Sequence, residues 1–217
     1  MTGPASRGVF GSPDEEELVY GLQATTALGW SGPPRLPVVP APVRRRRGWR
    51  QASVRRFEPP RAGDSELDRV LSAAYGVPGA RPVPSAGGLY PLRLVVVDIG
   101  EVRPASRSCP EWVALPSDEA EDLERAFFGS VTGPCSLVVV AGSVAGPAGR
   151  YGPRAYRYLL LEAGHCGQEL LRAAQDAGLA TCPLGAFDDS AVSRLLRLEW
   201  SGEIALYAVA VGRAVDR

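Results

Sequence analysis

Apolar residues recur along this chain with two different periods, and each period predicts a different element. Spacings of three and four residues predict amphipathic helices, whereas short runs of β-branched residues between turn residues predict buried strands. We expect helices over residues 65–75, 117–128, 153–177 and 189–196. We expect strands over residues 92–99, 135–141 and 204–211. Helices interspersed with a few apolar strands predict an α+β sandwich.

The segments before and between these elements differ in composition. Residues 1–43 are rich in Gly, Pro and Ser, apart from a possible short helix over 14–28, so they predict a partly disordered or extended N-terminal arm. Residues 44–217 then form one folded domain. The expected helix over 153–177 carries the sole histidine, His165, near its apolar stripe, where a packed histidine is expected rather than a catalytic one.

Charge and composition exclude several classes of function. All 24 basic residues are arginines, and they balance 24 acidic residues. A chain without lysine cannot form a Schiff base with pyridoxal phosphate or build a P-loop. The balanced charge argues against general nucleic-acid binding. A single histidine, and four cysteines without a CxxC pair, predict no metal site.

Hydropathy, the N-terminal segment and the cysteines together predict the cellular compartment. No apolar run approaches the ~20 residues that span a bilayer. The polar N-terminus lacks the features of a signal peptide. The four scattered cysteines are expected to be small buried side chains in a reducing environment. We therefore expect a soluble, cytoplasmic protein that does not bind a membrane.

Three local patterns carry candidate chemistry. Ser53 and Arg55, one residue apart after an arginine run, could together hold a phosphate, although surface arginines are common. The segment PSAGGLYP over 84–91 has small residues that let a backbone approach a flat ligand, unless it is simply a turn. The segment GLATCPLGAFDD over 178–189 is predicted as an apolar loop that offers backbone N–H groups.

The order of these patterns resembles a known family. A basic Ser-x-Arg-x-Phe is followed by PSAGGLYP, RYGPRAYRYLLLEAGHCGQELL, GLATCPLGAFDD and a terminal VGR. This order is similar to the nitroreductase superfamily, and in particular to the SagB-type dehydrogenases that include azoline oxidases. The resemblance covers residues 42–213. It implies an FMN-binding sandwich with a central mixed sheet flanked by helices, and a homodimer with FMN at the subunit interface.

The resemblance also implies roles for individual residues. Ser53 and Arg55 would contact the phosphate and ribityl chain of FMN, and Arg213 would be a second phosphate contact. Ser85, Ala86 and Gly87 would line the isoalloxazine from the partner subunit, and a backbone N–H of the 183–185 segment would lie near N5. The full cofactor-binding set is Arg50, Gln51, Ser53, Arg55, Pro84, Ser85, Ala86, Gly87, Pro183, Leu184, Gly185 and Arg213.

The catalytic pair departs from the family pattern. The family's Lys-Tyr pair corresponds to Arg150-Tyr151 here. Arginine keeps its proton, so Arg150 can supply only a fixed charge. Tyr151, with its proton affinity lowered by Arg150, would then be the base, and a structural role for Tyr151 is the alternative. Gln51-Ala52 stands where the family has Arg-Arg, which predicts weakened FMN binding unless a nearby arginine compensates.

Three functions follow from the resemblance. The first is an FMN-dependent dehydrogenase that oxidises thiazolines or oxazolines to azoles in a ribosomally made peptide, with the modified precursor peptide as substrate and cyclodehydratase-type partners. The second is an NAD(P)H-dependent reductase of nitro compounds or quinones. The third is a flavin-poor scaffold subunit of a peptide-modifying complex, suggested by Gln51-Ala52 and by the unfamiliar segment over 100–116.

Overall fold

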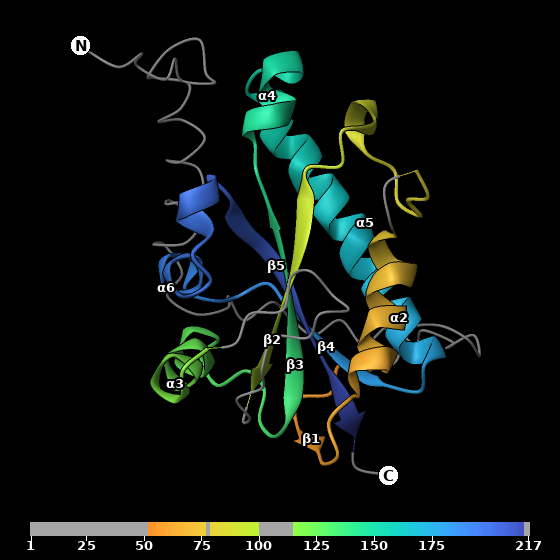
Figure 1. The fold of residues 1–217 in the computed structure, drawn as a ribbon, viewed down its shortest axis with the longest axis vertical. Coiled ribbons are helices and arrows are strands. Elements are labelled where there is room, and N and C mark those ends of the chain that lie inside the picture. The colour runs from red at the N-terminus through yellow and green to blue at the C-terminus, as the bar shows by residue number, and fades with distance from the viewer. Residues whose placement is uncertain (1–51, 77–78, 100–114, 215–217) are drawn as a thin grey trace, which may run out of the picture.

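The computed structural model describes residues 52–76, 79–99 and 115–214 of this chain (Figure 1). The strands are β1 (Phe57–Glu58), β2 (Leu92–Ile99), β3 (Cys135–Gly142), β4 (Ala180–Leu184) and β5 (Ile204–Ala214). The helices are α2 (Asp64–Tyr75), α3 (Ser117–Ala126), α4 (Ala145–Tyr151), α5 (Arg154–Asp176) and α6 (Asp189–Leu195). Two short 3₁₀ turns are η1 (Ala86–Gly88) and η2 (Leu198–Ser201). Each element predicted in the described part is present, with ends that differ by at most three residues.

The five strands form one sheet in which β5 is the central strand. β3 pairs with β2 on one side and with β5 on the other, while β1 and β4 both pair with β5. All four strand pairs are antiparallel, so the expected mixed sheet is corrected to an antiparallel one. A single isolated bridge between Arg56 and Thr132 is parallel. Apolar runs reveal that strands exist, but the tertiary connections decide their direction.

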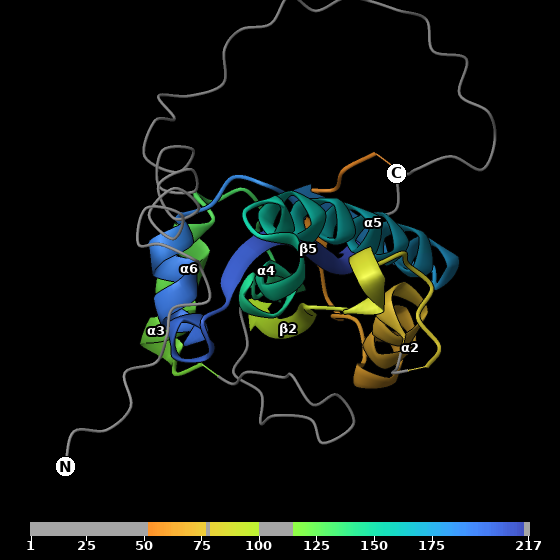
Figure 2. The same cartoon turned by 90° about the horizontal axis from the view of Figure 1, so that it is seen from above.

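Helices cover both faces of this sheet. Looking from above, α2 and α5 lie on one side of the sheet and α3 and α6 on the other (Figure 2). Alternate residues of each strand point to opposite faces. Thus Val96 of β2 packs into the core under α2 and α5, whereas its neighbours Val95 and Val97 pack into the core under α3 and α6. Because both faces of the sheet are covered by helices, these strands are continuous apolar runs rather than alternating ones.

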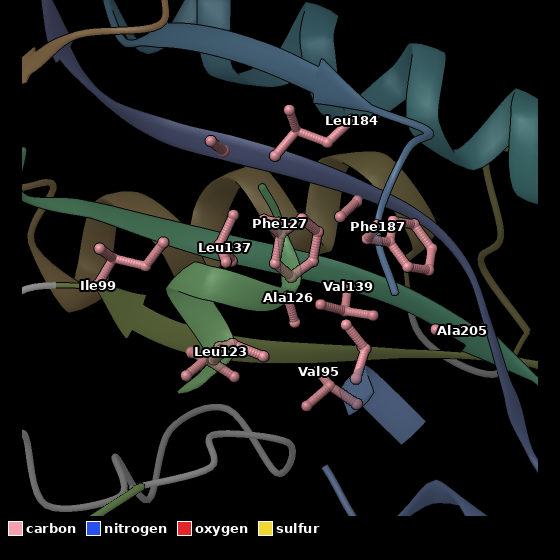
Figure 3. Packing of buried hydrophobic residues seen from close by; sticks show 14 of the residues in the cluster. Val95, Ile99, Leu123, Ala126, Phe127, Leu137, Val139, Leu184, Phe187 and Ala205 are labelled. Carbon is pink, nitrogen blue, oxygen red and sulfur yellow. The ribbon is translucent and has the colours of Figure 1, made fainter. Parts of the chain in front are cut away.

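Part of the segment predicted as an apolar loop over 178–189 is strand β4, Ala180–Leu184. Its side chains Cys182 and Leu184 are buried in the core under α3 and α6, where Phe187 packs on Phe127 with ring centroids 5.3 Å apart (Figure 3). In the sequence, Pro183 argues against a strand, because proline has no backbone N–H to donate to a neighbouring strand. It is tolerated because β4 pairs only with β5 among the described strands.

Two other expectations are changed by the structure. Helix α4 was not predicted, because its seven residues, AGPAGRY, lack an apolar stripe and contain Pro and Gly. His165 is exposed on α5, so the expectation of a packed histidine is wrong. Of the cysteines, Cys135, Cys166 and Cys182 are buried as expected, and burial raises the pKa of Cys135 and of Cys166 to about 12.

Several expectations fall outside the described residues. The N-terminal arm over 1–43, its boundary at residue 44, and most of the segment over 100–116 are among them. In the described ranges, no helix is long and apolar enough to cross a membrane. Within the same ranges, no group of three or more His, Cys, Asp or Glu residues could hold a metal ion.

Candidate functional site

The PSAGG segment meets the Arg150-Tyr151 pair within one chain. The 3₁₀ turn η1 precedes β2, and α4 follows β3, so antiparallel pairing of Leu92 with Gly142 brings both to one end of the sheet. Gly87 in this turn has φ +64°, and an added Cβ there would lie 2.7 Å from Tyr151 Oη and 2.9 Å from Arg150 Nη1. Only glycine allows this contact, because its backbone is both left-handed and closely approached.

The side chains around Tyr151 form a compact aromatic and basic group. The ring of Tyr151 packs edge-on against Tyr158 of α5, with centroids 5.0 Å apart. The guanidinium carbon of Arg150 lies 5.5 Å from the centroid of the Tyr151 ring. Arg150 is exposed and Tyr151 is half-buried. A phenol and a fixed positive charge are therefore presented together beside an exposed glycine turn.

The predicted phosphate contacts lie at the other end of the sheet. Ser53 and Arg55 precede β1, and both are exposed. Val54 N donates to Thr181 O of β4 at 2.8 Å, and Thr132 N donates to Arg55 O at 2.8 Å. These backbone bonds fix the segment between two neighbours, while Arg55 Nη1 donates to Ser130 O at 3.0 Å.

Arg213, the second predicted phosphate contact, is held by an acidic side chain. Its Nη2 donates to Glu66 Oε1 at 2.9 Å and to Glu66 Oε2 at 2.8 Å. Glu66 also accepts a hydrogen bond from Gly63 N at 2.8 Å, the capping contact at the start of α2. The Gly63 N–H and the Arg213 guanidinium hold the pKa of Glu66 below its usual range, against the opposing effect of burial. Both bonds use Nη2, so Nε and Nη1 of Arg213 do not contact Glu66.

We expect the Glu66→Gln variant to lose stability only where Glu66 is ionised. A depressed folded-state pKa stabilises the fold above the unfolded pKa, and that contribution is lost as the pH falls through the folded pKa. At pH 7 the variant should be less stable by about 1 kcal/mol, because one hydrogen-bonded ion pair is weakened. Urea unfolding at pH 7 and at pH 3 measures this, and an equal deficit at both values would contradict it.

Strand β4 lies between these two groups along the sheet. Its residues run from Ala180, opposite Gly212, to Leu184, opposite Ala208. Pro183 is half-buried, Leu184 is buried and Gly185 is exposed just beyond the strand. The predicted 183–185 segment is therefore an edge strand and its end, not a free loop. Its backbone position is fixed by the ladder to β5.

A single chain keeps the two groups of predicted residues apart. Eight residue pairs of β2 and β3 separate the end with Gly87 and Tyr151 from the end with Arg55 and Arg213. At roughly 3.4 Å per residue, that length is about 24 Å. Figure 1 shows α4 at the top of the molecule and β1 at the bottom.

The structure also adds contacts at Glu66 and Tyr158 that the sequence alone did not predict. Glu66 contacts Arg213, and its position three residues after Gly63 is a capping signal that could have drawn attention to it. Tyr158 packs on Tyr151, and only the fold reveals this contact because a helix break separates them. Arg50 and Gln51, predicted to bind the cofactor, lie outside the described residues.

Comparison with known proteins identifies the family of this chain. The nitroreductase family model matches residues 49–213, so this chain belongs to the nitroreductase family and is an oxidoreductase of that family. A protein of Methanocaldococcus jannaschii named as a nitroreductase is 28% identical over 164 residues, which cover 70% of this chain and 81% of the relative.

Solved structures share the fold. A chain of the Escherichia coli microcin synthetase McbBCD complex, with truncated pro-MccB17 bound, superposes with a TM-score of 0.68 and 17% identity. The match covers 95% of this chain and 96% of that chain. An FMN-dependent nitroreductase from Clostridium difficile superposes with a TM-score of 0.54 and 15% identity, over 77% of this chain and 85% of that one.

Proposed function

We propose that this protein is an FMN-dependent dehydrogenase that oxidises azoline rings to azoles in a ribosomally made, modified peptide. The observation that carries the proposal is the contact between the Gly87 turn and the Arg150-Tyr151 pair. An exposed glycine turn, a phenol and a fixed positive charge lie within one small surface. The full-length likeness to a chain of the microcin synthetase complex, which was solved with a propeptide, supports a peptide substrate.

Arg55 and Arg213, at the end of the sheet away from Tyr151, are placed to bind the phosphate of FMN in this proposal. Arg55 is exposed, and the side chain of Arg213 is 38% exposed with Nε and Nη1 not engaged by Glu66. Planar guanidinium groups grip phosphate oxygens well. Bound FMN would supply the hydride acceptor that no amino-acid side chain can provide.

Within this proposal Tyr151 removes the proton that accompanies hydride loss from the azoline ring. Its Oη lies against the exposed Gly87 turn, where it would meet a ring of the substrate. In that step the phenolate of Tyr151 takes up the proton and becomes the phenol, and Arg150, which keeps its proton, would stabilise the phenolate before the transfer. Tyr158 packs on the Tyr151 ring and restricts its rotation.

We further propose that the working enzyme is a homodimer whose site is shared by two subunits. The phosphate-binding residues of one copy and the Tyr151 end of the other would then meet, since one chain keeps them about 24 Å apart. Leu160 and Leu161 of α5 are 43% and 55% exposed, and Leu89 beside the Gly87 turn is 43% exposed. Exposed apolar side chains of this kind support the proposal that a second subunit covers the surface formed by α5 and the Gly87 turn.

A mixing experiment tests the shared site. Arg55→Glu should lose FMN binding and Tyr151→Phe should lose turnover, so each variant alone is expected to be inactive. In a mixed dimer, one site combines the intact Arg55 of one copy with the intact Tyr151 of the other, and activity should return to about a quarter of wild type after random exchange. No recovery, despite confirmed subunit exchange, would contradict a shared site.

The function itself is tested with a thiazoline peptide. Purified protein, FMN and its biosynthetic partners should convert the peptide to a product two hydrogens lighter, as measured by mass spectrometry. An unchanged peptide mass would overturn the proposal. Rapid bleaching of the flavin by NAD(P)H, with turnover of nitro compounds or quinones, would instead support a general reductase. An absorption spectrum without flavin after reconstitution with FMN would support a scaffold subunit.

A further inference from the structure

Next to the Gly87 turn lies a group of buried and half-buried charged and aromatic side chains that the proposed chemistry does not use. We define the Arg81 cluster as Tyr75, Arg81, Tyr90 and Glu162. Tyr75 ends α2, Arg81 and Tyr90 flank the segment that contains η1, and Glu162 belongs to α5. The cluster therefore joins two helices to both ends of the 82–89 segment.

Arg81 is the central member of this cluster. Its guanidinium carbon lies 4.3 Å from the centroid of the Tyr75 ring and 5.3 Å from that of the Tyr90 ring. The two rings are themselves 6.2 Å apart in an edge-to-face arrangement. Arg81 Nη1 also donates to Tyr75 O at 3.1 Å and to Gly76 O at 3.3 Å, so it satisfies carbonyls at the end of α2.

Glu162 anchors the cluster to the long helix. Its carboxylate is buried and accepts a hydrogen bond of 2.7 Å from Tyr75 Oη, which also accepts one of 3.3 Å from Leu92 N. Burial and this carboxylate together raise the pKa of Tyr75, so the phenol stays protonated as the donor. The positive Arg81, which lies over the Tyr75 ring, partly offsets the buried negative charge.

Tyr90 shows that the cluster constrains the backbone of the segment. Its φ is +48°, a left-handed conformation that an aromatic residue rarely adopts. Two contacts maintain this conformation: Tyr90 N donates to Ser85 Oγ at 2.9 Å, and the ring packs on Arg81 and Tyr75. Strained conformations persist only where their surroundings fix them.

From this geometry we infer that Arg81 is a positioning residue, which clamps both ends of the 82–89 segment and thereby sets the distance between the Gly87 turn and Tyr151. The segment begins after Arg81, approaches Tyr151 at Gly87 and ends before Tyr90, whose ring packs on Arg81. An arginine is needed because its flat guanidinium can stack on rings and donate to two carbonyls at once. For its catalytic consequence, this inference rests on the proposed function.

The test compares Arg81→Met with Arg81→Lys in the full-length protein. Met keeps much of the apolar stem but loses the charge and the donors, whereas Lys keeps the charge. We expect amide hydrogen exchange over residues 84–90 to be about tenfold faster in Arg81→Met and intermediate in Arg81→Lys, without a matching change in α5 or β5. The matched control is Arg69→Met, since Arg69 is an exposed arginine of α2 whose Nε donates to Ser65 O of the same helix.

The kinetic readout separates positioning from general stability. With a thiazoline peptide, kcat of Arg81→Met should fall about tenfold while KM stays within twofold. The reason is that the Gly87 turn and Tyr151 are both still present but are displaced relative to each other. Arg81→Lys should recover part of kcat. Exchange over 84–90 equal to wild type, or raised equally throughout the domain, would overturn the inference. The exchange readout uses no substrate, so it stands if the wild-type protein fails to oxidise azolines, an outcome that overturns only the proposed function.

Discussion

Replacing Tyr151 by Phe should reduce the kcat of azoline oxidation by about 10²–10⁴, the range typical of losing a positioned acid–base group. The ring remains and can still pack on Tyr158, so the local structure should be preserved. Only the Oη that lies against the Gly87 turn is lost. The measurement is steady-state product formation by mass spectrometry, together with the flavin absorption band, which should match wild type.

Tyr158→Phe is the control for this variant. It removes a hydroxyl from the ring stacked on Tyr151 and leaves the aromatic contact in place. We expect its kcat within about threefold of wild type, because no proton transfer depends on it. If Tyr151→Phe turned over at the wild-type rate, Tyr151 would have a structural role and another group would have to accept the proton.

Gly133→Ala should have the largest effect on stability. Gly133 has φ +85°, and an added Cβ would lie 2.1 Å from the backbone oxygen of Phe57, which cannot move away without displacing β1. The strained conformation and the clash together should cost roughly 3 kcal/mol of unfolding free energy. For a chain of this size the melting temperature should fall by roughly 10 °C.

The same substitution should also affect the predicted phosphate end. Thr132 bonds to Arg55 O and Phe57 N on the segment that Gly133 approaches, so the shift should move Arg55 and weaken FMN binding. Gly129→Ala is the matched control, since Gly129 has φ +59° but no atom near an added Cβ. It should lose only about 1 kcal/mol, from backbone strain alone. Equal losses in both variants, by thermal unfolding, would contradict the clash.

The helices and the longer strands could be predicted from the sequence because their signal is local. The stripe that becomes α5 repeats over six turns, and Gly178 follows its end with φ +74°. The buried runs of β2 and β3 are too apolar to be anything but core elements. By contrast, α4 and β4 are short, contain Pro, and owe their conformation to what packs on them. Local propensity is a weak predictor for such segments.

For the candidate site, the sequence specified the residue types, and the fold decided which of them meet. The complete absence of lysine limits the pair at 150–151 to a fixed charge and a phenol, whatever the fold. That Gly87 lies against Tyr151 depends on antiparallel pairing of β2 with β3. That Arg213 is held by Glu66, 147 residues away along the chain, depends on β5 ending beside the start of α2. Long-range contacts of this kind come from strand register and helix packing, which no local pattern in the sequence encodes.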